Sequence, residues 1–258
     1  MSANFFVVLP FLLLVTLIVW RIWFYKKEID LKGFTQDWRD ILNKKVSFYA
    51  DLPLTDKFRF EEEILYFFDD VTITGVKIEI NDLDRLLVAA SAVIPLFGFP
   101  ELRYRNINEV LLYKGSFNED NQTEGEGRNI LGKVGSGNMN RLMILSLPAL
   151  RAGFENENSK SNVGIHEFVH LIDKADGAVD GIPESLMQKQ YVAPWLKLMH
   201  KEIDNIRERE SDINPYGATN EVEFLSVASE YFFNNPKTFQ KKHPELYDLM
   251  KKMYRFTR

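Results

Sequence analysis

The chain has 258 residues, a size at which one hydrophobic core usually stops growing, so one large domain or two small ones are expected. Hydrophobic residues make up 45% of the sequence, enough apolar surface to exclude global disorder, and the absence of cysteine excludes disulfides and cysteine-based zinc sites. The formal net charge of −5 argues against a general attraction to nucleic acid, so no direct nucleic-acid partner is expected.

Residues 5–25 form an apolar run that is interrupted only by Thr16 and Arg21. As an α-helix this run would extend roughly 31 Å, about the thickness of the hydrocarbon core of a membrane. Nothing basic precedes the run and no small-residue cleavage site follows it, which favours a transmembrane anchor over a cleaved signal peptide. A buried soluble helix is the third interpretation, although such helices rarely stay apolar on every side.

Basic residues follow this run, at Lys26, Lys27 and Lys32, and none precedes it. The positive-inside rule therefore places the C-terminal side of the run in the cytoplasm. We predict a single-pass membrane protein whose large C-terminal domain is cytoplasmic. Residues 1–33 would form the transmembrane anchor with its juxtamembrane linker, and residues 34–258 the folded domain.

Apolar residues at helical spacing predict two helices early in the folded domain, one with Thr55 as its N-cap and one with Asp82. Short β-type runs follow one another at residues 71–80, 110–113 and 142–146. The segment 118–140 is rich in Gly and Asn, which predicts a mobile surface loop, with a hidden hairpin as the alternative.

Three further helices are expected in the C-terminal half, at residues 164–175, 185–210 and 220–233. The second of them is predicted despite Pro194 in its interior. Helices therefore dominate the pattern and strands are few and short. We predict an α+β fold, a mainly helical domain with a small sheet, preceded by one transmembrane helix.

His166 and His170 lie four positions apart in a predicted helix, so their rings project from one face, a turn apart. Two imidazoles so placed can hold one zinc ion, and Glu167 can reach a water on that ion. Zinc would lower the pKa of the water, and Glu167 would take its proton as general base. The alternative, a structural histidine pair, is disfavoured because a chance match to this pattern is on the order of one in a hundred.

A catalytic zinc site needs a third protein ligand, and a later helix offers two carboxylates. Glu223 and Glu230 are seven positions apart, on one face of a largely apolar helix where a carboxylate needs a partner. Glu223 could instead be the third residue of a capping box opened by Asn220, and Glu230 could support a ligand or form a salt bridge. The residue pattern alone does not choose between the two glutamates.

Several stretches of the sequence carry a family resemblance. They are HEFVHLID at 166–173, DG at 176–177, GIP at 181–183, YGATNEVEF at 216–224 and SEYFF at 229–233, together with residues 95–99 and 110–117. Together they resemble the Mlc titration factor A family of zinc metallopeptidases. The resemblance covers most of the chain from about residue 36 onward.

This resemblance implies a zincin-like metallopeptidase domain with one Zn²⁺ per chain, held by His166, His170 and a downstream glutamate that matches Glu223. It also implies that Tyr216, seven residues before that glutamate, assists the transition state, whereas the residue pattern alone allows a turn tyrosine. Asp173 falls on the ligand face of its helix, where it is expected to hydrogen-bond a ligand or close the helix end. The family resembled is soluble and binds a transcriptional repressor, so the apolar run at residues 5–25 is an addition here.

Two functions are compatible with these patterns. The first is a membrane-anchored zinc metallopeptidase acting on a peptide or protein substrate, with residues 142–146 offering a strand edge along which the substrate backbone could pair. The second is a zinc-containing binding protein that sequesters a transcriptional regulator at the membrane. Glu167 favours the enzyme, because a structural zinc site has no need of a base.

Overall fold

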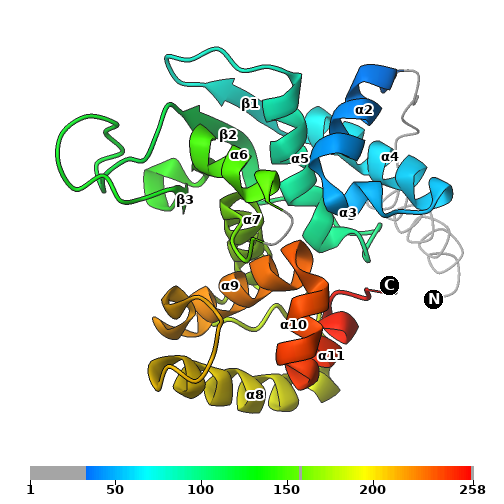
Figure 1. Cartoon of the computed structure of the whole chain (residues 1–258). Coiled ribbons are helices and arrows are strands. Elements are labelled where there is room, and N and C mark those ends of the chain that lie inside the picture. Colours follow the sequence, from blue (N-terminus) through cyan, green and yellow to red (C-terminus); the bar gives the residue numbers. More distant parts are fainter. Residues whose placement is uncertain (1–32, 157–158, 257–258) are drawn as a thin grey trace, which may run out of the picture. The chain divides into compact units, whose positions relative to one another are not determined.

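The computed structural model describes residues 33–156 and 159–256 (Figure 1). The α-helices are α2 (Gln36–Lys45), α3 (Ser47–Ala50), α4 (Leu54–Asp70), α5 (Asp82–Leu96), α6 (Leu147–Glu155), α7 (Val163–Asp173), α8 (Lys189–Arg207), α9 (Glu221–Asn234), α10 (Pro236–Lys242) and α11 (Pro244–Met253). The strands are β1 (Thr72–Gly75), β2 (Ile107–Tyr113), β3 (Gly132–Val134) and β4 (Arg141–Ser146). Short 3-10 helices are η2 (Gly137–Met139), η3 (Lys174–Asp176) and η4 (Pro215–Ala218).

The strands of the described residues form one sheet in the order β1-β2-β4-β3. β1, β2 and β4 run parallel, and β3 pairs with β4 in the antiparallel direction. The register aligns the buried residues Ile73, Val110 and Met143 across the three parallel strands. β4 is therefore paired on both sides, and β3 forms one edge of the sheet.

α5 and α7 pack closely in the middle of the folded domain. α5 begins with a capping box, in which the side chains of Asn81 and Asp84 each accept a hydrogen bond from the backbone N–H of the other residue. The rest of α5 is apolar and largely buried. At the start of α7, a β-carbon on Gly164 would overlap the hydroxyl of Ser91 on α5. Glycine at this position therefore permits the close approach of the two helices.

α7 is held from two sides. It contacts α5, α6, β3 and β4 on one side and α9 on the other (Figure 1). The ring of Phe168 on α7 packs against Phe67 and Tyr104, with centroids 5.6 and 5.1 Å apart. Burying one such side chain contributes about 1.5–3 kcal/mol, so the apolar faces of α7 fix the helix firmly in place.

Asp212 joins the segment that precedes α7 to the C-terminal helices. Its carboxylate accepts hydrogen bonds from Lys160 at 2.5 Å, Lys242 at 2.8 Å and the Tyr231 phenol at 2.9 Å, and lies 2.7 Å from Nε2 of His243. Lys160 lies two residues before the N-cap of α7. The network therefore helps to fix where α7 begins relative to α9 and α10.

The predicted helices are present, but the two predicted N-caps, Thr55 and Asp82, are wrong. α4 begins at Leu54, because Pro53 ahead of it has an extended backbone, so Thr55 lies inside the first turn and is not the N-cap. α5 is capped by Asn81 and not by Asp82, because the side chain of Asn81 makes the cap hydrogen bond. In both cases the cap lies one or two residues before the predicted position.

Other predicted elements are shorter in the structure. α8 starts at Lys189 and not at residue 185, because the chain before it forms a turn in which the N–H of Leu186 bonds the carbonyl of Pro183. β1 covers only part of the predicted run 71–80. The segment 118–140, predicted as a loop, contains β3 and η2. Phe117 and Ile130 form an antiparallel bridge, and β3, which begins two residues after Ile130, pairs with β4.

The predicted α+β fold, mainly helical with a small sheet, is confirmed. The predicted single-pass membrane localisation is wrong for the part of the chain that the structure describes: no helix there is long and apolar enough to cross a membrane. Its long helices, such as α8, carry many charged side chains. The predicted span at residues 5–25 lies outside the described residues, and the cytoplasmic orientation, inferred from that span, falls with the localisation. The domain boundary at residue 33 stays a prediction.

Candidate metal centre

α7 places two histidines and a glutamate in one part of the molecule. The helix begins at its N-cap Asn162, whose side chain accepts a hydrogen bond from the N–H of Ile165 at 3.1 Å. His166 and His170 lie one turn apart on this helix, with ring centroids 4.6 Å apart. Glu167, next to the first histidine, is only 6% exposed. The cap therefore sets the helical frame on which these three side chains are displayed.

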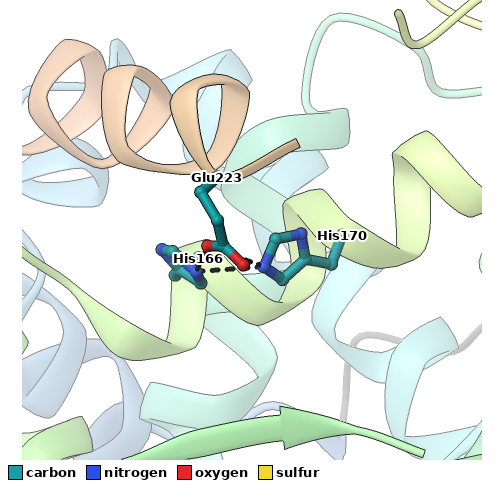
Figure 2. Close-up of side chains that lie close together, drawn as sticks. All are labelled: His166, His170 and Glu223. Carbon is teal, nitrogen blue, oxygen red and sulfur yellow. Dashed lines mark hydrogen bonds and ion pairs between the residues drawn. The ribbon is translucent and has the colours of Figure 1, made fainter. Parts of the chain in front are cut away.

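Glu223 on α9 completes a cluster with the two histidines (Figure 2). Its Oε2 atom lies 3.0 Å from Nε2 of His166 and 3.5 Å from Nε2 of His170. The two Nε2 atoms are themselves 3.0 Å apart. The structure thus brings together the three residues that the sequence analysis predicted as metal ligands. Their role as ligands stays a prediction.

The spacing of these atoms fits a metal ion. Tetrahedral ligands at zinc distances of about 2.0–2.1 Å lie about 3.3 Å from one another, close to the separations in the cluster. Each imidazole is also held through its other nitrogen: Nδ1 of His166 lies 2.7 Å from Glu230 and Nδ1 of His170 lies 3.1 Å from Ser226. Such contacts fix each ring so that its Nε2 faces the centre of the cluster. The donor set of two imidazoles and one carboxylate therefore fits a catalytic metal site.

Glu230 occupies a different place from Glu223, although both lie on α9. One of its oxygens pairs with Nδ1 of His166, and the other accepts the backbone N–H of Asn162 at 2.5 Å. Glu230 therefore lies behind the imidazole, away from the Nε2 atoms. The N–H of Glu223 bonds the side chain of Asn220 at 2.9 Å, while its carboxylate faces the histidines. The geometry thus separates two glutamates that the residue pattern could not.

The carboxylates give the cluster negative surroundings. Burial disfavours charge on His166, but Glu223 and Glu230 outweigh burial and raise the pKa of this histidine to about 10. Burial also opposes ionisation of Glu223, yet the two histidines lower its pKa to about 2. Burial raises the pKa of Glu167. The cluster therefore favours a positive charge at its centre, which a proton on His166 or a metal cation can supply.

The family of the chain follows from its sequence match. Residues 20–255 match the family model described as "Glucose-regulated metallo-peptidase M90". The match covers far more than half of the chain. The chain belongs to this metallopeptidase family. A His-Glu-His helix whose two imidazoles meet a carboxylate from another helix is in keeping with that class.

Curated proteins that are similar to this M90 chain point to the same family. An uncharacterised protein of Synechocystis is 26% identical over 255 residues, which cover 91% of this chain and 88% of the relative. Mlc titration factor A of Klebsiella pneumoniae is 24% identical over 250 residues, covering 90% and 91%. Mlc titration factor A of Pectobacterium atrosepticum is 27% identical over 192 residues, covering 68% and 69%. The predicted resemblance to the Mlc titration factor A family is confirmed.

Tyr216, on η4 of this M90 chain, lies beside the cluster. Its ring centroid is 6.0 Å from that of His166, and the residue is 53% exposed. Partial burial and the negative charges of Glu223 and Glu167 raise the pKa of the phenol, which therefore keeps its proton at neutral pH. The side chain thus faces both the cluster and the solvent, where a substrate would arrive. Its role in the transition state stays a prediction.

Asp173, the last residue of α7, bonds the loop that follows the helix. Its Oδ2 atom accepts the backbone N–H of Gly181 at 3.2 Å. The carbonyl of Gly181 in turn accepts the indole N–H of Trp195 at 2.8 Å. Asp173 was expected to bond a ligand or to close the helix end, and the bond that the structure shows instead ties the loop after the helix to α7.

Two residues of the site were missed in the sequence. Asn162 caps α7 and donates its backbone N–H to Glu230, and Ser226 holds the ring of His170. Asn162 had a detectable signal, because it lies four residues before His166, where an N-cap would stand one turn ahead. Ser226 gave a weaker one, as a polar residue without a local role inside an apolar helix.

Proposed function

We propose that the chain is a zinc-dependent metallopeptidase in which His166, His170 and Glu223 hold one zinc ion. Glu167 is the general base, and Tyr216 donates a hydrogen bond to the transition state. The observation that carries this proposal is the convergence of two imidazole nitrogens and one carboxylate oxygen next to a buried glutamate. Membership of a metallopeptidase family supports it.

The residues divide the chemistry of peptide hydrolysis among them. A zinc ion bound at the cluster supplies Lewis acidity, which polarises the peptide carbonyl and acidifies water. Glu167 takes a proton from the attacking water and gives it to the leaving amine. Burial raises the pKa of Glu167, so it retains that proton more readily than an exposed glutamate between the two transfers. The Tyr216 phenol donates a hydrogen bond to the oxyanion that forms on the carbonyl.

The edge of β3 supports the binding of an extended peptide. This role was expected for residues 142–146, but those residues form β4, which is paired on both sides. Leu131 and Gly135 hydrogen-bond the backbone of β4 at 2.7 and 2.8 Å. The alternation of an antiparallel ladder therefore turns the N–H and C=O groups of Gly132 and Val134 toward the open edge. A peptide that pairs there would run beside α7.

Removal and return of the metal tests the proposal. We expect the purified protein to bind about one zinc ion per chain and to cleave peptides from a fluorogenic library. A chelator should abolish cleavage together with bound metal, and zinc should restore both, because Glu167 alone cannot activate water sufficiently. Metal analysis and cleavage are measured on the same samples, with zinc-saturated chelator as the control. Full cleavage by metal-free protein would contradict the proposal.

Binding of a transcriptional regulator is a second candidate function. The name Mlc titration factor A, carried by two of the relatives, favours it. This function predicts a regulator bound without turnover, with an affinity that Glu167→Gln leaves unchanged. A peptidase instead loses cleavage in that variant. Calorimetry with the regulator and a cleavage assay on the same two proteins separate the candidates.

Tyr216→Phe is expected to lower kcat by about 10- to 100-fold, because the variant keeps the ring but loses the hydrogen-bond donor. Metal content should stay the same, since the phenol is not one of the three clustered ligands. Steady-state kinetics on a peptide substrate measure the effect. Tyr191→Phe on α8, which removes a phenol elsewhere, is the matched control. A Tyr216→Phe protein with the wild-type kcat would remove Tyr216 from the mechanism.

A further inference from the structure

Gly132, the first residue of β3, lies directly against Glu167 of α7. A β-carbon on Gly132 would come within 2.5 Å of Oε1 and 2.7 Å of Cγ of Glu167, and within 2.8 Å of a methyl group of Val163. Real β-carbons essentially never come closer than 3.0 Å to such neighbours. A side chain larger than hydrogen at this position therefore forces a shift, and two of the three nearest atoms that it would meet belong to Glu167.

Space, and not backbone conformation, is what requires glycine at this position. Gly132 is absent from the glycines with positive φ, so its backbone conformation is open to other residues as well. Its neighbour Lys133 lies in the same strand and carries a long side chain, whose Nζ atom is 3.3 Å from Oε2 of Glu119. The strand thus tolerates side chains, except where it meets Glu167.

We propose that Gly132 is a positioning residue for Glu167, because its missing side chain leaves the space in which the Glu167 carboxylate lies beside the open edge of β3. This inference rests on the proposed peptidase function, in which Glu167 is the general base. Gly132 also turns its backbone N–H and C=O groups toward that edge. Glu167 and the backbone of a substrate paired with β3 would therefore both lie against Gly132. A residue with a side chain at this position would not leave room for Glu167.

The metal ligands are not the first groups that a side chain at this position would reach. The three atoms nearest to the added β-carbon all belong to Glu167 and Val163. The backbone groups of Gly132 that face the open edge persist when a methyl group is added. An alanine should therefore displace the base while leaving metal binding and peptide binding largely intact, which separates kcat from KM.

Gly132→Ala tests this separation. We expect kcat to fall by about 100-fold, the size of effect that an ångström-scale misplacement can produce, with KM within about threefold of wild type and metal content unchanged. Gly115→Ala is the matched control, because a β-carbon on Gly115 has nothing within 4 Å. A wild-type kcat in Gly132→Ala would overturn the proposal, and so would an equal loss in the control.

A double-mutant cycle measured by thermal unfolding tests the same contact without relying on catalytic activity. Gly132→Ala should lower Tm by about 3–10 °C in the wild type and by about half of that or less in a Glu167→Ala background, where the space is vacated. Equal losses in both backgrounds overturn the proposal. If Gly132→Ala alone does not fold, a folded double variant supports the proposal and an unfolded one overturns it. A wild-type protein that cleaves no peptide would refute the peptidase function while this cycle still reports on the contact.

Discussion

Glu167→Gln is expected to lower peptide cleavage by about 10²- to 10⁴-fold while leaving about one metal ion bound per chain. Glutamine has nearly the shape of glutamate, so it fits the same space between α7 and β3. Its amide cannot take a proton from water, and the reaction therefore loses its base. The three clustered ligands are not altered, which is why metal content should not change. Initial rates and metal analysis on the same preparation measure both quantities.

The control for this variant removes a similar charge away from the site. Glu184→Gln alters an exposed glutamate in the loop between η3 and α8 and should leave both rate and metal content as in the wild type. Cleavage by Glu167→Gln at the wild-type rate would refute the assignment of the base. Loss of metal in Glu167→Gln would instead show that the substitution disturbs the ligand cluster. The two failures are distinguishable in one experiment.

The sequence revealed the part of the site that depends on local geometry. His166, Glu167 and His170 lie within five residues of one helix, and helical spacing alone places both imidazoles on one face. The choice between Glu223 and Glu230 depends instead on how α9 crosses α7. Both glutamates satisfy the same helical periodicity, so only the packing of the two helices shows which carboxylate faces the Nε2 atoms.

The strand at the open edge was hidden for a different reason. β3 has only three residues, Gly132–Val134, within a segment rich in glycine and asparagine that predicts a loop. Its strand conformation comes from pairing with β4, a tertiary contact that overrides local preference. Residues 142–146 gave a clear strand pattern because β4 is buried. Its pairing with both β2 and β3 shows that this strand does not form the edge.

Glu223→Gln is expected to weaken zinc binding by more than about 100-fold and to abolish cleavage, because a neutral amide is a much poorer ligand than a carboxylate. Glu230→Gln is the matched variant, with the same chemical change on the same helix. Its expected cost in zinc affinity is about 10- to 100-fold, the range typical of a group that orients a ligand, because one oxygen of Glu230 holds the ring of His166.

Zinc titration of the metal-free proteins, followed by a cleavage assay at saturating zinc, ranks the two glutamates. Excess zinc should restore most of the activity of Glu230→Gln, since all three clustered ligands remain. It should not restore Glu223→Gln, whose site has only two imidazoles left. The reverse ranking would make Glu230 the ligand, and α9 would then have to turn so that Glu230 leaves Nδ1 of His166 and Asn162. That turn would leave the buried N–H of Asn162 without its acceptor, a cost of about 1–3 kcal/mol that argues for Glu223.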